Sequence, residues 1–495
     1  MNLLAFDLGA SGGRVMEGQF SGDRILLSEL VKFEHGPVPM GDGLYWEIAG
    51  IYRKLLEGLR KASGKVFSLG IDSFCNDFGF IDKNGELLTS VRSYRDSRTL
   101  RYADYVYSKI PPFYLYKLTG NQNAPFNTLM QIGAMQAAGQ GWIFENAYKF
   151  LFVPDLFIYF LTGEISAEYT VSSVSQLYSF TDRDFSGEVL EAFNLRRDLF
   201  GTIAMPGTVT GQIRESLCRE QGLSPFKVIS VCSHDTASAY LSSPLDRRDA
   251  IIISSGTWAL MGCELEVPLA NEVTYHYNIA NEGGYPGYHR FLKNVMGSWI
   301  IQEIRAEYRT KGIEYSYAEL EAAAKKAPPF AYYIDVDDNR FFTPGNLTGK
   351  ILETCRVNYG SAPDDLGALI RCVYESLAMK YRRNLECLEE ASGVKFNVIN
   401  IVGGGSKDTL MCQFTADACK RPVAAGPQDA TVLGNMLVQL ISAGKIASIR
   451  EGRNLIAASF PPVWYESENA SLWEEGYKHY CDLYPVEPFC MPKMT

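Results

Sequence analysis

The sequence predicts an α/β fold of two lobes, with a mixed sheet at the centre of each lobe. Two glycine- and serine-rich turns carry this prediction. Each directly follows an apolar strand, and each lies in its own half of the chain, within 3–14 and 251–260. At 495 residues the chain is also too long for one compact core, and such a length favours about two to four domains. Two related lobes that close on each other account for both observations.

The first half begins with apolar segments separated by glycine-rich turns, which is typical of a meander of short strands. A segment with amphipathic helical spacing follows, and then two short apolar runs that predict buried strands. The predicted strands are 3–6, 15–20, 25–33, 66–71 and 78–81, and the predicted helix is 46–62. Three strands, a helix and further strands therefore make up the first pattern.

The second half repeats this pattern more loosely. The predicted strands are 250–254, 258–263 and 398–402, the predicted long helix is 366–391, and an amphipathic helix is predicted at 473–484. Asp364 and Asp365 lie just before the long helix, where an N-cap belongs. The last of these helices predicts a C-terminal helical cap on the second lobe.

A polar, proline-containing stretch at 242–249 predicts the boundary between the lobes. It gives an N-terminal lobe of 1–245 and a C-terminal lobe of 246–495, of nearly equal length. Segment 111–200 is rich in aromatic residues and predicts an insertion packed on the first lobe. Aromatic side chains in such a segment form a core more often than a ligand platform.

Composition and charge narrow the class of protein. The net charge of −10 argues against binding to nucleic acid or to acidic membranes. The chain begins directly with a strand and has no apolar run of about 18 residues, so a cytoplasmic protein is expected. The 11 cysteines, from Cys75 to Cys490, form no Cys-x-x-Cys pair. Whether Cys355 and Cys372 pair stays open, as does the oligomeric state.

Each of the two turns can act as a cradle for a phosphate, because backbone N–H groups and small hydroxyls bind anions and glycine permits close approach. A single turn of this kind is more often a simple hairpin connection. Asp7 at the end of the first strand offers an oxygen to a magnesium ion, and Thr257 in the second turn offers a hydroxyl. No P-loop motif is present and a strand follows Gly13, so Rossmann and P-loop folds are disfavoured.

A third glycine cluster, 403–405, ends a predicted strand and precedes a helix expected near Asp408. Three glycines leave a flat backbone on which an adenine or ribose can lie, and they also suit tight packing of a helix on a strand. The two interpretations are about equal. The loop at 425–435, which leads into another helix, is expected to close the same pocket.

Asp235 is the strongest single candidate for chemistry. It lies where a strand runs into a helix, so an N-cap role is the simpler interpretation. The functional alternative is a general base, since phosphoryl transfer asks for positioning, charge neutralisation and a carboxylate that accepts the hydroxyl proton. His234 is suited to hydrogen-bond a sugar hydroxyl, although a lone histidine is usually structural. With five histidines and no paired motif, a histidine metal site is not expected.

A series of motifs in order resembles the FGGY carbohydrate kinases, of the actin-like, ribonuclease-H-like ATPase superfamily, and within them most closely the rhamnulokinases. The motifs are 7–14, 94–99, 125–129, 154–155, 168–170, 206–207, 233–238, 254–258, 281–284, 292–294, 402–405 and 434–435. The resemblance implies a two-lobe kinase that transfers the γ-phosphoryl group of MgATP to the 1-hydroxyl of L-rhamnulose. Its implied partners are thus a deoxy-ketose and ATP, with Mg²⁺ as cofactor.

The resemblance also implies a role for individual residues. Asp235 would be the catalytic base and Asp7 would serve the metal through water. The nucleotide would be bound by Ala10, Ser11, Gly12, Gly13, Arg14, Thr257, Gln302 and Gly404. The sugar would contact Cys75, His234, Thr236 and Asn294, with weaker support for Arg95 and Asp96.

The chain departs from the rhamnulokinase pattern at 74–76, where Phe-Cys-Asn stands in place of Trp-Gly-Val. Cys75 thus replaces a glycine expected to lie against the sugar, which changes the shape of that pocket. Because one methyl group is worth only ~1–3 kcal/mol in such sites, L-fuculose and other deoxy-ketoses stay open as substrates. A non-catalytic protein on the same scaffold is the alternative from another class, although Asp7, Thr257 and Asp235 are all present.

Overall fold

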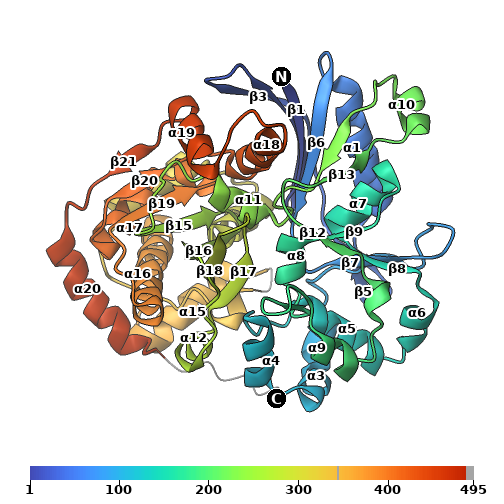
Figure 1. Ribbon diagram of the computed structural model, residues 1–495. Coiled ribbons are helices and arrows are strands. Elements are labelled where there is room, and N and C mark those ends of the chain that lie inside the picture. Colours follow the sequence, from blue (N-terminus) through green and yellow to red (C-terminus); the bar gives the residue numbers. More distant parts are fainter. Residues whose placement is uncertain (343–344, 487–495) are drawn as a thin grey trace.

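The computed structural model describes residues 1–342 and 345–486 and consists of two lobes side by side (Figure 1). A six-stranded mixed sheet forms the centre of the first lobe, in the order β13-β14-β6-β1-β2-β3. Its strands are β1 (Asn2–Leu8), β2 (Gly12–Phe20), β3 (Ile25–Glu34), β6 (Val66–Ser73), β13 (Val209–Gln212) and β14 (Lys227–Ile229). The strand β1 pairs antiparallel with β2 and parallel with β6, so the predicted mixed sheet is confirmed.

The second lobe contains a seven-stranded mixed sheet in the order β17-β18-β16-β15-β19-β20-β21. Its strands are β15 (Ala250–Ser255), β16 (Trp258–Leu265), β17 (Ala280–Gly283), β18 (His289–Met296), β19 (Val398–Val402), β20 (Val423–Ala425) and β21 (Val463–Tyr465). Each central strand, β1 and β15, has one antiparallel and one parallel neighbour. The two lobes therefore repeat the same pairing around the strand that precedes each turn.

Helices cover both faces of the first sheet. Successive residues of a strand point to opposite faces, so β1 contributes to the core on each side. On one face Leu4, Phe6 and Leu8 pack with α1 (Ile48–Lys61) and α7 (Val153–Thr162). The opposite face, with Leu3 and Ala5, packs against a second group of helices. These are α11 (Asp235–Leu241), α18 (Ala430–Ser442) and α19 (Ile449–Ser459).

The helices α11 and α18 lie between the two sheets (Figure 1). Their other sides pack on the second sheet, where Tyr240 and Ala430 join a cluster with Ile252 and Leu292. Gly434 permits this crossing, since a Cβ there would overlap the Ser238 carbonyl of α11. The strands of the two sheets separate on either side of 242–249, yet α18 comes from beyond it. The lobe boundary there stays a prediction.

The outer face of the second sheet carries the largest core of the molecule. Its helices are α13 (Trp299–Thr310), α14 (Tyr317–Lys326), α15 (Leu347–Tyr359), α16 (Leu366–Ser392), α17 (Thr409–Cys419) and α20 (Ala470–Leu483). Asp365 caps α16 as predicted, because its side chain accepts a hydrogen bond from the Ala368 N–H at 2.8 Å. The helix α20 packs its Trp473 and Tyr480 into this core, and its role as a cap on the lobe stays a prediction.

The aromatic segment of the first lobe forms a core of its own, as predicted, around Phe80, Phe150 and Phe200. It surrounds the hairpin of β7 (Phe78–Ile81) and β8 (Lys149–Phe152). The helices here are α2 (Arg98–Arg101), α3 (Ala103–Lys109), α4 (Pro112–Thr119), α5 (Thr128–Ala137), α6 (Gly141–Asn146), α8 (Tyr169–Ser173) and α9 (Gly187–Ala192). Smaller elements elsewhere are β4 (Val38–Met40), β5 (Gly43–Tyr45), β9 (Ser166–Glu168), β10 (Tyr178–Ser179), β11 (Asp184–Phe185), β12 (Thr202–Ala204), α10 (Glu215–Gln221) and α12 (Glu272–His276).

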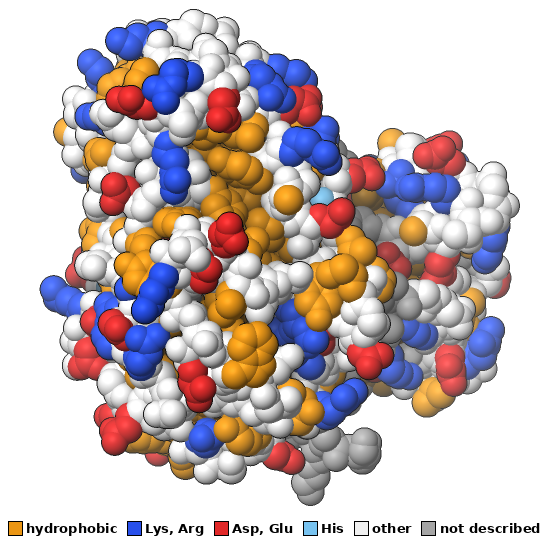
Figure 2. Space-filling view, turned by 90° about the vertical axis from the view of Figure 1, so that its right-hand side faces the viewer, with side chains coloured by type: hydrophobic (Ala, Val, Ile, Leu, Met, Phe, Trp, Pro, Cys, Tyr) orange, Lys and Arg blue, Asp and Glu red, His pale blue; other side chains and the backbone are white. Residues whose placement is uncertain are grey.

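Cys355 and Cys372, whose pairing the sequence leaves open, are free thiols that face each other within hydrogen-bonding reach. Cys490 lies outside the described residues. Among the helices of 1–342 and 345–486, none combines the length and the apolar character needed to cross a bilayer. On the face shown in Figure 2, Lys and Arg side chains are interspersed with Asp and Glu.

Candidate functional site

Three aspartates from three elements converge where the first lobe meets α11. Asp7 and Asp72 are direct neighbours on the parallel strands β1 and β6. Ser73, next to Asp72, forms a β-bridge with His234, which directly precedes Asp235. Burial raises the pKa of Asp72 well above its usual range, and the charges of Asp7 and Asp235 add to this rise. Two further carboxyl groups thus lie within electrostatic range of the buried Asp72.

Asp72 is fully buried and has one oxygen without a partner. Its Oδ2 accepts a hydrogen bond from Asn435 Nδ2 of α18 at 2.6 Å, whereas its Oδ1 has none. A buried carboxylate oxygen in this state is costly, and it calls for a ligand or a cation. Asp72 was absent from the residues that the sequence singled out.

Asp235 is the first residue of α11, and His234 is the N-cap, so the N-cap interpretation of Asp235 is wrong by one residue. The Asp235 Oδ1 accepts hydrogen bonds from the Thr236 N–H at 2.6 Å and the Thr236 hydroxyl at 3.2 Å. Its side chain stays 30% exposed, which leaves it reachable by a substrate. Burial raises its pKa; His234 opposes the rise and Asp7 adds to it.

His234 is held by groups from the second lobe. Arg290 of β18 lies with Nη2 3.0 Å from His234 Nδ1. Because a guanidinium cannot accept a hydrogen bond, Nδ1 is the acceptor and the ring proton is on Nε2. The Nε2 atom lies 3.4 Å from Asp235 Oδ1. The histidine therefore directs a donor toward the carboxylate and the space beside it.

Glu282 of β17 completes this group. Its Oε2 forms an ion pair with Arg290 Nη1 at 2.8 Å and lies 3.5 Å from His234 Nδ1. Burial would raise the pKa of Glu282, but the charge of Arg290 opposes this rise, and the pKa is lowered. Asn294 lies on the same face of β18 as Arg290, four residues further along the strand. Its buried Oδ1 has no partner, which leaves an acceptor free for a ligand.

Gly12 and Gly13 of the first glycine-serine turn pack against strand β3 of the same lobe. A Cβ on Gly13 would lie 2.5 Å from the Phe33 ring, and one on Gly12 would lie 3.0 Å from the Phe33 carbonyl oxygen. Packing against β3 is thus a sufficient reason for both glycines. Ala10 is half-buried and Ser11 is exposed, so their backbone and hydroxyl groups remain accessible.

Arg14 connects the first turn to the second lobe. Its Nε donates to Asp7 Oδ2 at 2.9 Å, and its Nη1 donates to Asp429 Oδ1 at 2.6 Å. Asp429 directly precedes α18. The guanidinium is therefore shared by two carboxylates, and its contact with a nucleotide stays a prediction.

Residues just before α13 hydrogen-bond to the second turn and hold it in place. The Gly256 carbonyl accepts from the Ser298 N–H and hydroxyl, and the Thr257 carbonyl accepts from the Gly297 N–H at 3.2 Å. Gln302 Nε2 donates to Ser298 Oγ at 2.8 Å, one helical turn away. Thr257 and Gln302, which are distant in sequence, thus belong to one structural unit.

The triple glycine lies against the same turn, and it separates the two interpretations left open by the sequence. A Cβ on Gly405 would overlap the Ser255 hydroxyl, and one on Gly403 would lie 2.9 Å from the Ser255 carbonyl oxygen. Gly404 is exposed, with nothing within 4 Å of its Cβ position. Two of the glycines therefore serve packing, and Gly404 offers an open backbone surface.

The loop that departs from the expected pattern lies close to the aspartates. Phe74 stacks on Trp46 with ring centroids 4.5 Å apart. Burial raises the pKa of the Cys75 thiol well above its usual range, and the charges of Glu282 and Asp235 add to the rise, which places Cys75 near both. Asn76 has a φ of 74°, and its carbonyl accepts from Thr128 and Gln131. The loop is thus held from two sides.

Sequence reasoning missed Asp72, Glu282, Arg290, Asp429 and Asn435 as members of this region. Asp72 lies beside Asp7 because of the register in which β1 and β6 pair, and the sequence of either strand alone does not reveal that register. No group of three or more His, Cys, Asp or Glu side chains within 1–342 and 345–486 is arranged to hold a metal directly.

Comparison with known proteins agrees with this geometry. The model for the N-terminal domain of the FGGY family of carbohydrate kinases matches residues 42–242, and the model for its C-terminal domain matches residues 251–443. The rhamnulokinase of Bacteroides thetaiotaomicron is 35% identical over 97% of this chain and 98% of its own length. That of Enterococcus faecalis is 36% identical over 94% of each chain.

Solved structures share the fold at lower identity. Xylulose kinase from Lactobacillus acidophilus superimposes with a TM-score of 0.79 at 15% identity, over 97% of both chains. Plasmodium falciparum glycerol kinase with ADP does so with a TM-score of 0.78 at 13% identity, over 99% of both chains. On these matches the chain belongs to the FGGY family of carbohydrate kinases and is a phosphotransferase with an actin-like two-lobe fold.

Proposed function

We propose that the protein is an ATP-dependent kinase that phosphorylates the 1-hydroxyl of L-rhamnulose. The observation that carries the reaction type is Asp235, a reachable carboxylate of raised pKa at the start of α11, where the two lobes meet. The named rhamnulokinases, at 35% and 36% identity over nearly the full chain, support the choice of sugar.

The nucleotide is assigned to the side formed by the second lobe. Thr257 and Gln302 belong to one turn-and-helix unit, and Gly404 exposes its backbone beside them. Neutral hydroxyl, amide and backbone groups are suited to polyphosphate and ribose. The first turn, 10–14, faces from the other lobe with its own backbone N–H groups. ATP held between them would present its γ-phosphate toward the aspartates.

Two carboxyl groups of this cluster, those of Asp7 and Asp72, would suit a magnesium ion that takes its other ligands from water and phosphate. Asp72 Oδ1 is buried without a partner, and the charge of Asp7 adds to the rise in pKa of both Asp72 and Asp235. Asp7 and Asp72 would hold the ion, with Asp7 acting through water, and the ion would supply charge neutralisation on the transferred group. All remaining chemistry falls to the side chains of this chain.

Asp235 acts as the general base. The O1 oxygen of the sugar forms a bond to the γ-phosphorus, the bond from that phosphorus to the β,γ-bridging oxygen breaks, and ADP leaves. The O1 proton passes to the Asp235 carboxylate. A pKa above the usual aspartate value makes this oxygen a stronger acceptor than an exposed aspartate.

His234 orients the sugar rather than carrying the proton. Arg290 fixes the tautomer with hydrogen on Nε2, so the ring donates toward a sugar oxygen beside Asp235. Thr236 and Asn294 contribute a hydroxyl and an unpaired amide oxygen from either side. Cys75 would line the same space, with a thiol at a position where the expected pattern has no side chain.

The thiol of Cys75 would change the shape of the sugar pocket and could therefore change which deoxy-ketose binds best. L-fuculose differs from L-rhamnulose only in stereochemistry, and a changed pocket wall acts on that difference. The pseudokinase alternative is weaker, because Asp7, Thr257 and Asp235 are present and Asp235 is accessible. ADP production that depends on a sugar would exclude it.

A coupled assay of ADP release over L-rhamnulose, L-fuculose, L-xylulose, D-xylulose, L-ribulose and glycerol tests the proposal. We expect kcat/KM to be highest for L-rhamnulose, with phosphate on O1 of the product by phosphorus NMR. A higher value for L-fuculose would overturn the choice of sugar and leave the reaction type in place. ADP release unchanged by all six compounds would contradict the kinase itself.

A further inference from the structure

A pocket in the first lobe adjoins the loop at 74–76, which we call the sugar-side loop. Gln131 lines the pocket and donates a hydrogen bond to the Asn76 carbonyl of this loop. It has a volume of about 340 Å³, which is within the range of small-molecule sites. Its walls come from β7, α5, α6 and the segment 89–98. None of its lining residues belongs to the three-aspartate cluster, the two turns or the triple glycine.

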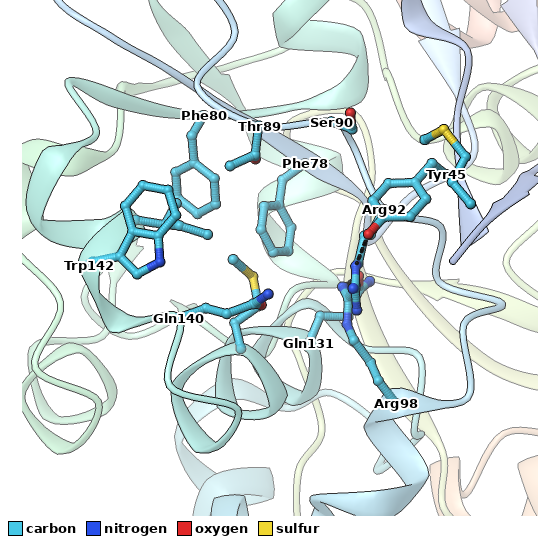
Figure 3. Close-up of a pocket in the computed structure, with 13 residues that line it drawn as sticks. Tyr45, Phe78, Phe80, Thr89, Ser90, Arg92, Arg98, Gln131, Gln140 and Trp142 are labelled. Carbon is cyan, nitrogen blue, oxygen red and sulfur yellow. Dashed lines mark hydrogen bonds between the residues drawn. The ribbon is translucent and has the colours of Figure 1, made fainter. Parts of the chain in front are cut away.

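The pocket has two chemically different ends (Figure 3). Phe78, Phe80 and Trp142 lie at one end, and Arg92 and Arg98 lie at the other. Thr89, Ser90 and Gln140 place hydroxyl and amide groups along the walls. Trp142 is 51% exposed, so the aromatic end opens to solvent. An occupant with one anionic end and a hydroxylated body would match both ends.

Arg98 is a buried cation with most of its donors unused. The residue is only 9% exposed, and its Nη2 donates to Gln131 Oε1 at 2.9 Å, while Nε and Nη1 have no partner. Burial and the nearby charge of Arg92 lower its pKa to about 10, although the charges of Asp96 and Asp77 oppose this change without hydrogen-bonding to Nε or Nη1. A buried guanidinium in this state is costly unless an anion completes it.

Arg92 presents a second guanidinium at the same end. Its Nε donates to the Tyr45 hydroxyl at 3.1 Å, and its Nη1 lies 3.9 Å from Asp96 Oδ2, a long ion pair. The Asp96 oxygens accept from the backbone N–H groups of Leu44 and Arg98. Asp96 is thus engaged with the backbone, and two guanidinium groups remain for a ligand. Arginine pairs are suited to phosphate because their donors match its oxygens.

We propose that this pocket binds a small phosphorylated polyol, with the phosphate on Arg92 and Arg98 and the polyol against Trp142 and Phe80. The occupant would contact the residue that holds the sugar-side loop. Gln131 accepts from Arg98 and donates through Nε2 to Asp77 Oδ1 at 2.9 Å and to the Asn76 carbonyl at 3.2 Å. The pocket is therefore separate from the three-aspartate cluster. Gln131 connects Arg98 of the pocket to the loop at 74–76 by hydrogen bonds.

The test measures binding rather than turnover. The probe is ribose 5-phosphate, an aldose phosphate and hence not the ketose 1-phosphate of the proposed reaction, with inorganic phosphate and ribose as the two halves of its chemistry. Tryptophan fluorescence and calorimetry report binding to the full-length protein. We expect ribose 5-phosphate to bind at least tenfold more tightly than inorganic phosphate, ribose not to bind, and the Trp142→Phe variant to lose the fluorescence change.

Arg92→Gln is the main variant, because Arg92 is at the rim and its loss leaves the buried residues in place. Arg101→Gln is the matched control, since Arg101 is an exposed arginine at the end of α2 and does not line the pocket. We expect Arg92→Gln to weaken binding at least tenfold and Arg101→Gln to change it less than twofold. Equal binding by both variants, equal affinity for inorganic phosphate, or no binding to the unaltered protein would each overturn the proposal.

Discussion

The two lobes contribute opposite chemistry to the region where they meet. The first lobe supplies Asp7 and Asp72, and the charge of Asp7 adds to the rise in pKa of Asp72 and Asp235. Its glycine turn is packed against Phe33. The second lobe supplies a turn with Thr257 and an exposed Gly404, without a carboxylate among the groups that form it in the described chain. An anion as charged as ATP is suited to the neutral side, and a cation to the acidic side.

This difference teaches that two similar sequence patterns have different physical causes. Gly13 is required by a neighbouring ring, whereas Gly404 meets nothing in the folded chain. A glycine with free space around it is the stronger indication of a ligand. The predictions below test whether the acidic and neutral sides differ as described.

The largest effect is expected on the acidic side, from Asp72→Asn. Removing the charge weakens the cation site, and we expect kcat to fall on the order of 100-fold. The unfolding free energy should stay within about 1 kcal/mol, because lost carboxylate repulsion offsets an imperfectly bonded amide. Steady-state kinetics and urea unfolding measure the two quantities. Activity within twofold of the unaltered protein would remove Asp72 from the site.

On the neutral side, Gly404→Ala and Gly405→Ala form a matched pair of adjacent substitutions. A Cβ on Gly405 overlaps the Ser255 hydroxyl, so Gly405→Ala should lower the unfolding free energy by about 1–3 kcal/mol. Gly404→Ala should leave stability unchanged and raise KM for ATP several-fold, since its Cβ enters the space assigned to the nucleotide. The same unfolding experiment and an ATP titration compare them. Reversed outcomes would exchange the packing and binding roles.

The smallest effect is a displacement of the pH profile. Burial raises the Asp235 pKa above its usual value of 3.8, and a base must be deprotonated to act. We therefore expect kcat/KM to fall as pH decreases, with the acid limb centred above pH 3.8. Thr257→Val, on the neutral side, should lower kcat/KM without moving this limb. A limb displaced equally by Thr257→Val would place the titrating group elsewhere.

Local pattern predicted much of the fold. Strand β19 matches its prediction residue for residue because it is a short apolar run, and α16 differs by one residue because apolar periodicity and the Asp365 cap define it. The sequence could not predict that α18 lies between the sheets. That arrangement depends on Gly434, which lets α18 approach α11 closely.

Site residues that belong to a local turn or helix start could be predicted from the sequence. Site residues whose role depends on a contact with a residue distant in sequence could not. Asp235 begins a helix and Thr257 lies in the turn between two strands, and local pattern identifies both positions. Arg290 is the second residue of β18, and its role follows only from its contact with His234, 56 residues away. Asp72 likewise follows from strand register, and Asp429 from a contact between the lobes.

The most direct test of the account is the Asp235→Asn variant, measured for sugar phosphorylation and for MgATP binding on the same preparation. The amide keeps the shape of the side chain and cannot accept the proton. The account predicts that kcat falls at least about 1,000-fold while the dissociation constant for MgATP changes less than twofold. Turnover within tenfold of the unaltered protein, with intact nucleotide binding, would contradict Asp235 as the base.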